Sequence, residues 1–194
     1  MVANQFIKYL AGLFLVLLVT SCNPFSQPAA FSTELDGKVC MNLPVGFVET
    51  GNMHDHSTFQ FRHPEKNIFL LGFSDSKRKI RKMIPNLGIE DYLDFVSRNV
   101  RANLDSVWNA SGSTLFPLGL KGKLREIRGI ERETNNPMDM TYVIGVIENK
   151  TDFFQVVGWC QSNESESLCL AMEDMVGSAA QAENNSGNEA EGGR

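Results

Sequence analysis

Two runs dense in β-branched and aromatic residues near the end of the chain most constrain its fold. They cover residues 140–148 and 152–161, with only residues 149–151 between them. A connection this short joins neighbouring antiparallel strands, and the apolar side chains of one strand then face those of the other. The sequence therefore predicts a β-hairpin here.

The rest of the body follows either a strand or a helix period. Further strands are predicted at 38–43, 58–63, 67–73, 113–120 and 123–134. From Gly88, apolar residues recur at helical spacing, with acidic residues first and arginines later, as the helix dipole prefers. A final helix is predicted around Leu168 and Met172. Strands and helices are segregated along the chain, so the predicted class is α+β with an antiparallel sheet.

The first 21 residues have the features of a signal peptide. Lys8 precedes an apolar run, residues 10–19, which is shorter than the ~20 residues that span a bilayer. The tetrapeptide Val-Thr-Ser-Cys that ends at Cys22 resembles the bacterial lipobox, in which the cysteine thiol receives diacylglycerol. The resemblance implies a lipoprotein anchored through Cys22, by acyl chains such as palmitate, with an ordinary secretory signal as the alternative. Asn23, where an aspartate would imply inner-membrane retention, implies the outer membrane and a domain facing the periplasm.

The remaining chain divides into three parts. Of the 194 residues 42% are hydrophobic and 21% charged, as in a globular protein with one domain. Residues 22–35 are predicted to be the lipidated cysteine and a flexible tether, and residues 36–178 a single domain. Residues 179–194 contain no large apolar side chain and are predicted to be a disordered tail.

Several features of the body occur in a characteristic order. They are the phrase Val-Cys-Met-Asn-Leu-Pro-Val-Gly-Phe at 39–47, a hairpin, the helix opening at 89–93, the Leu-Lys-Gly strand entry at 120–122, and a strand pair before a short last helix. In this order they resemble the DcrB and PsbP-like group of the Mog/PsbP fold, over residues 36–178. The resemblance implies an antiparallel sheet between helices, an α/β/α sandwich. Because members of that group are mostly non-enzymatic accessory or binding domains, many of them envelope lipoproteins, it also implies a binding role.

No catalytic signature is present. The sequence lacks a Gly-x-Ser-x-Gly elbow, a P-loop, a His-Glu-x-x-His helix and a Gly-x-Gly-x-x-Gly turn. The formal net charge of −5 disfavours nucleic acid as a partner. We therefore expect no enzyme and no cofactor. The expected partners are the membrane, through the lipid, and another envelope protein. An immunity or inhibitor lipoprotein is an alternative.

The histidines form one cluster in the sequence. His54, His56 and His63 lie within ten residues, and His-x-His on a strand points both rings to one face. If the chain reverses before His63, three imidazoles could hold zinc or copper. A metal-binding protein is therefore a further alternative to the binding role.

Cys160 and Cys169 flank the connection between the last strand and the last helix. Exported proteins meet an oxidising compartment, so we predict a disulfide that adds about 2–3 kcal/mol. Cys40 is then left as a buried thiol, with a disulfide that reshuffles to include it as the alternative.

A basic run stands out in this acidic protein. It contains Lys77, Arg78, Lys79, Arg81 and Lys82. Five positive charges in six residues suit contact with anionic lipid, lipopolysaccharide phosphate or a protein partner, and a solvated loop is the alternative.

Overall fold

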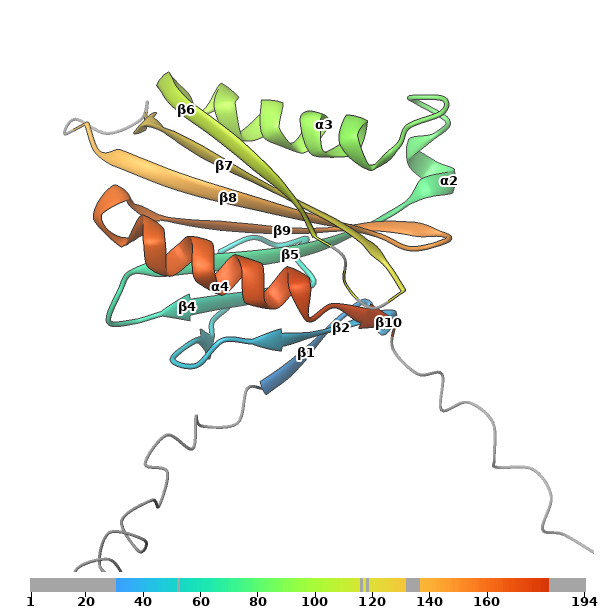
Figure 1. Cartoon of the computed structure of the whole chain (residues 1–194), viewed down its shortest axis with the longest axis horizontal. Coiled ribbons are helices and arrows are strands. Elements are labelled where there is room, and N and C mark those ends of the chain that lie inside the picture. The colour runs from blue at the N-terminus through green and yellow to red at the C-terminus, as the bar shows by residue number, and fades with distance from the viewer. Residues whose placement is uncertain (1–30, 52, 116, 118, 132–136, 182–194) are drawn as a thin grey trace, which may run out of the picture.

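The computed structural model of the chain describes residues 31–51, 53–115, 117, 119–131 and 137–181. It has an α+β fold of antiparallel sheets and helices, which confirms the predicted class (Figure 1). The strands are β1 (Phe31–Leu35), β2 (Val39–Leu43), β3 (Val48–Glu49), β4 (Phe59–His63), β5 (Ile68–Ser76), β6 (Leu104–Leu115), β7 (Lys121–Glu131), β8 (Asp139–Glu148), β9 (Asp152–Gln161) and β10 (Ala180–Gln181). The helices are α2 (Lys77–Ile80), α3 (Ile89–Ala102) and α4 (Ser165–Gly177), and α4 follows a 3-10 turn at Ser162–Glu164. No helix of the described residues is long and apolar enough to cross a membrane.

The larger sheet has the strand order β3-β4-β5-β9-β8-β7-β6, and every neighbouring pair is antiparallel. The predicted hairpin is β8–β9, whose register pairs Glu148 with Phe153. The strand predicted at 113–120 was misplaced, because β6 begins at Leu104 and ends at Leu115. Its sequence is mostly small and polar, and it lies at the edge of the sheet, where few side chains are buried.

The two faces of the larger sheet pack against different helices. On β8, Ile144 and Val146 belong to the core that includes α3, whereas Val143 and Ile147 belong to the core that includes α4. Successive strand residues point to opposite faces, so this run is apolar throughout because both faces are covered. The layers are α3, the larger sheet, and then α4 with the smaller sheet (Figure 1).

The folded domain extends beyond its predicted boundaries at both ends. β1 lies in the segment predicted as tether and β10 in the segment predicted as tail, and both pair with β2 to form the smaller sheet. Asp36 and Gly37 both have positive φ, and the Lys38 N–H donates to the Leu35 carbonyl at 3.0 Å, as in a type I′ turn. The buried Ala179 continues the core beyond α4. The predicted signal peptide, Cys22, and the rest of tether and tail lie outside the described residues.

Three glycines on neighbouring strands lie beneath α4. A Cβ atom on Gly145 would lie 2.5 Å from a methyl of Val176, and one on Gly158 would lie 2.6 Å from a methyl of Leu168. A Cβ atom on Gly122 would likewise lie 3.3 Å from a methyl of Val176. The missing side chains therefore let α4 approach the sheet closely.

Replacing Gly158 by valine is predicted to destabilise the domain by about 1–3 kcal/mol, because the added methyls overlap Leu168 and Leu70 in a packed core. The urea midpoint measures this loss. Gly177→Ala is the control, since Gly177 has no atom within 4 Å of an added Cβ. An unchanged midpoint for Gly158→Val would contradict the close approach of α4.

Candidate functional site

Lys77, the first residue of the basic run, points into the protein. Its side chain is 9% exposed, and its Nζ pairs with Glu148 Oε1 at 2.7 Å. The same ammonium donates to the Asn149 carbonyl and lies 4.9 Å from the centre of the Phe153 ring. Lys77 is therefore unavailable for the surface contact that the sequence predicted, because its charge is compensated internally. It instead fastens α2 to the β8–β9 turn.

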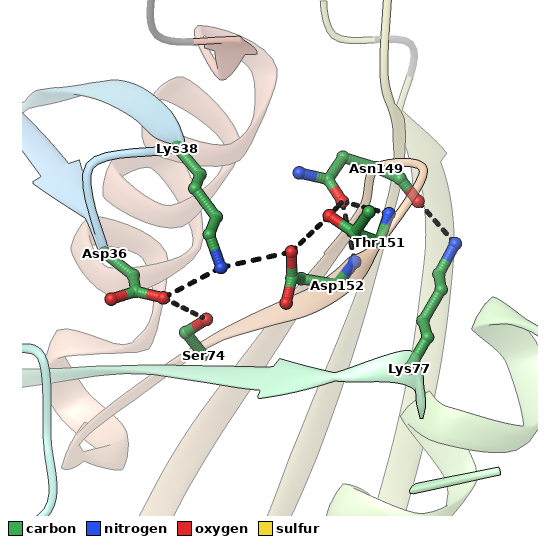
Figure 2. Close-up of polar contacts among 7 residues, drawn as sticks. All are labelled: Asp36, Lys38, Ser74, Lys77, Asn149, Thr151 and Asp152. Atoms are coloured by element: carbon green, nitrogen blue, oxygen red, sulfur yellow. Dashed lines mark hydrogen bonds and ion pairs between the residues drawn. The ribbon is translucent and has the colours of Figure 1, made fainter. Parts of the chain in front are cut away.

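That turn is ordered by its own side chains (Figure 2). Asn149 Oδ1 accepts hydrogen bonds from the backbone N–H groups of Thr151, at 2.9 Å, and Asp152, at 2.7 Å. The buried Asp152 carboxylate accepts a hydrogen bond from the Thr151 hydroxyl and forms an ion pair with Lys38 at 3.2 Å. These contacts fix the backbone that faces Lys77.

Lys38 extends the network to the smaller sheet. Its Nζ lies 3.1 Å from Asp36 Oδ2, which also accepts a hydrogen bond from the Ser74 hydroxyl at 3.3 Å (Figure 2). The Asp36 carboxylate, with Asp152 as a second partner, raises the pKa of Lys38. The β1–β2 turn, β5 and the start of β9 are thereby joined.

A pocket of about 690 Å³ lies beside this network, and we call it the basic pocket. It is lined by Ser76, Lys77, Arg78, Arg81, Lys82, Lys150 and Thr151. Arg78, Arg81, Lys82 and Lys150 are exposed, and no ion pair joins any of them to a carboxylate within the described residues. Lys79 is also exposed but does not line the basic pocket. The pocket therefore concentrates uncompensated positive charge in an acidic protein.

Lys150 and Thr151 were not predicted from the sequence to belong to a site. The register of β5 and β9 pairs Ser76 with Asp152, which brings the β8–β9 turn beside α2. The Lys77 N–H also donates to the Thr151 carbonyl at 2.9 Å. Nothing local to residues 149–151 signals this proximity, because it depends on the order of strands in the sheet.

The three histidines do not form the metal site considered from the sequence. His54 packs edge-on against Phe73, with ring centres 5.0 Å apart, and its Nδ1 accepts the N–H of His56. His63, at the end of β4, packs against Phe47 at 5.5 Å. Across the described part of the chain, no group of three or more His, Cys, Asp or Glu side chains is placed to hold a metal ion.

The disulfide predicted between Cys160 and Cys169 is not formed in the structure, where both residues are free thiols. Cys160 is buried at the end of β9. Cys169, on α4, is half-buried and packs against the same core, and it lines a groove with residues of β6, β7 and β8. Cys40 is half-buried rather than buried, and also free.

Comparisons with known proteins show the fold. No family model matches the sequence, and no curated protein matches it significantly. The solved structure of LpqN, involved in cell envelope biogenesis of Mycobacterium tuberculosis, is 11% identical, with 81% of this chain and 87% of LpqN covered at a TM-score of 0.50. Cyanobacterial PsbP (CyanoP) from Synechocystis sp. PCC 6803 is 10% identical, with 83% of this chain and 97% of CyanoP covered at a TM-score of 0.55. The chain has a PsbP-like fold. At these identities the likeness carries no activity or ligand across.

Lys77→Met is predicted to lower the free energy of unfolding by about 2–4 kcal/mol, because it leaves the largely buried Glu148 carboxylate without its partner. Chemical denaturation measures the change. Lys79→Met removes the same charge from an exposed position and is expected to cost less than about 0.5 kcal/mol. Equal losses in the two variants would contradict the structural role of Lys77.

Burial raises the pKa of the Cys160 thiol to about 12. At pH 8 only about one part in ten thousand is then thiolate, the form that reacts. Alkylation of Cys160 by iodoacetamide in the native protein should be on the order of a thousandfold slower than that of free cysteine. In urea, without reductant, both Cys160 and Cys169 should be labelled. Labelling of this pair only after reduction would instead show the disulfide.

Proposed function

We propose that the chain is a lipid-anchored lipoprotein of the cell envelope, whose domain is a non-catalytic accessory module that binds an anionic envelope component. The observation that carries the binding role is the basic pocket, where four exposed cations have no ion-pair partner among the described residues. Uncompensated charges held in a concave site favour a ligand of opposite charge. LpqN, which shares the fold, is involved in cell envelope biogenesis.

The lining of the basic pocket suits binding better than catalysis. General acid–base chemistry needs a group that exchanges protons near neutral pH, most often histidine or a carboxylate. The residues that line the pocket include neither, and the Thr151 hydroxyl is already donated to Asp152. The pocket therefore offers positive charge and neither a histidine nor a carboxylate.

The proposed anchor keeps the domain close to its membrane. Residues 23–30 separate Cys22 from the start of β1, and at no more than ~3.6 Å per residue they span at most about 29 Å. This maximum length is shorter than that of the predicted tether, which extended to residue 35, because β1 begins at Phe31. Asn23 after the lipidated cysteine supports the outer membrane as the destination.

The anchor is tested by lipid labelling of the full chain in a Gram-negative host. Wild-type protein should take up an alkyne analogue of palmitate and lose its first 21 residues, as measured by mass spectrometry. Cys22→Ala should abolish the label and leave the leader attached, because the acceptor thiol is gone. Cys40→Ala is the matched control and should be labelled like wild type. Label retained by Cys22→Ala, or absent from wild type, would refute the anchor.

A further inference from the structure

We infer that the basic pocket is a binding site for a phosphate-bearing ligand, held by Arg78, Arg81, Lys82 and Lys150. The inference rests on the proposed binding function and names the ligand chemistry of the same pocket. The sequence run alone indicated contact with anionic lipid, lipopolysaccharide phosphate or a protein partner, and it indicated no pocket. The structure divides that run and adds Lys150 from a distant part of the chain.

The electrostatics of the basic pocket favour concentrated negative charge. Lys77 is compensated by Glu148, and Asp152 is occupied by Lys38 and the Thr151 hydroxyl. The four remaining cations repel one another across a shared cavity, and an anion bound among them relieves that repulsion. A phosphate group places up to two negative charges on one tetrahedral centre, and arginine binds such a group through two parallel hydrogen bonds.

The cations stand on two walls that are fixed relative to each other. Arg78, Arg81 and Lys82 come from α2 and the turn after it, where the Arg81 N–H donates to the Lys77 carbonyl at 2.9 Å. Lys150 comes from the β8–β9 turn, which Asn149 orders. Because Lys77 joins the two walls, part of the ordering cost of binding is met by the fold.

The basic pocket has room for more than a single ion. Its volume of about 690 Å³ lies within the ~300–1,000 Å³ typical of small-molecule sites. We therefore expect a ligand with more than one phosphate, or a phosphate on a larger polar group. A lipid headgroup and a soluble phosphorylated compound share this chemistry.

Lys79 distinguishes binding inside the basic pocket from general attraction to a positively charged surface. It belongs to the same helix and is exposed like Arg78, but it does not line the basic pocket. Attraction to a flat anionic surface would weaken equally when Lys79 or Arg81 loses its charge. The affinity for a ligand inside the pocket depends on the charges of Arg81 and Lys150 and does not change when Lys79 loses its charge.

The experiment is calorimetric titration of the mature protein, purified in nonionic detergent, with inorganic pyrophosphate. We expect saturable binding at one site per chain. Arg81→Gln and Lys150→Gln should each weaken the affinity at least tenfold, and Lys79→Gln less than twofold. Circular dichroism checks that each variant is folded. Absence of saturable binding, or equal losses in Lys79→Gln and Arg81→Gln, would overturn the phosphate site.

Two further titrations test whether the phosphate belongs to a lipid or to a soluble compound, and whether the ligand is an acidic protein instead. The protein is anchored in phosphatidylcholine vesicles, and phosphatidic acid is added to them. If lipid phosphate is the ligand, the affinity for pyrophosphate should fall; if the affinity is unchanged, the ligand is a soluble phosphate compound. Both outcomes support the site. Hexaglutamate serves as an acidic-protein probe. If it binds in an Arg81-dependent manner and pyrophosphate does not, the phosphate inference fails while the proposed anionic-partner function stands. If neither probe binds, both fail.

Discussion

The ammonium of Lys77 is held inside the protein by the Glu148 carboxylate, the Asn149 carbonyl and the ring of Phe153. A charge removed from water is tolerated only when it is paired and hydrogen-bonded, so this cluster of contacts permits one position of α2 against the β8–β9 turn. The other cations near it have no such partners among the described residues and face the basic pocket. Within one run of similar residues, Lys77 therefore holds α2 in place, and the cations that follow it line the basic pocket or remain exposed to solvent.

The sheet supplies the frame in which that contact forms. β5 and β9 are neighbours although about eighty residues separate them, and their register sets Ser76 opposite Asp152. On the other face, α4 lies close over Gly145 and Gly158 and connects to the smaller sheet through a shared core. Lys38 and Asp152 then join the smaller sheet to the same turn. Contacts from both sheets therefore hold the backbone that carries the four cations of the basic pocket.

Local patterns in the sequence identify most of the fold and only part of the site. The apolar residues of β8 and β9 and the helical spacing from Ile89 to Val100 were sufficient to predict these elements. Buried positions recur with the period of a strand or a helix, so the apolar residues that fill them show the same period. β1 has no clear apolar period, yet the Asp36-Gly37 turn that follows it is a recognised hairpin signal from which the strand could have been predicted. The basic run was found, but the inward direction of Lys77 depends on Glu148, and the contribution of Lys150 depends on strand order. The histidines are close in sequence, and the rings of His54 and His56 stay in contact with centres 6.0 Å apart, but His63 packs on Phe47 instead.

Lys77 is a buried structural cation, whereas we propose that Lys82 and Lys150 hold a ligand. The most direct measurement is ¹⁵N-detected NMR of the lysine ammonium groups at neutral pH, with and without inorganic pyrophosphate. Burial and hydrogen bonding slow the exchange of ammonium protons with water, so Lys77 should give a signal in the free protein, and Lys82 and Lys150 should gain signals only when pyrophosphate is added. If the ammonium protons of Lys77 exchange as fast as those of Lys79, Lys77 is not a buried structural cation. If the signals of Lys82 and Lys150 are unchanged by pyrophosphate, these lysines do not hold it.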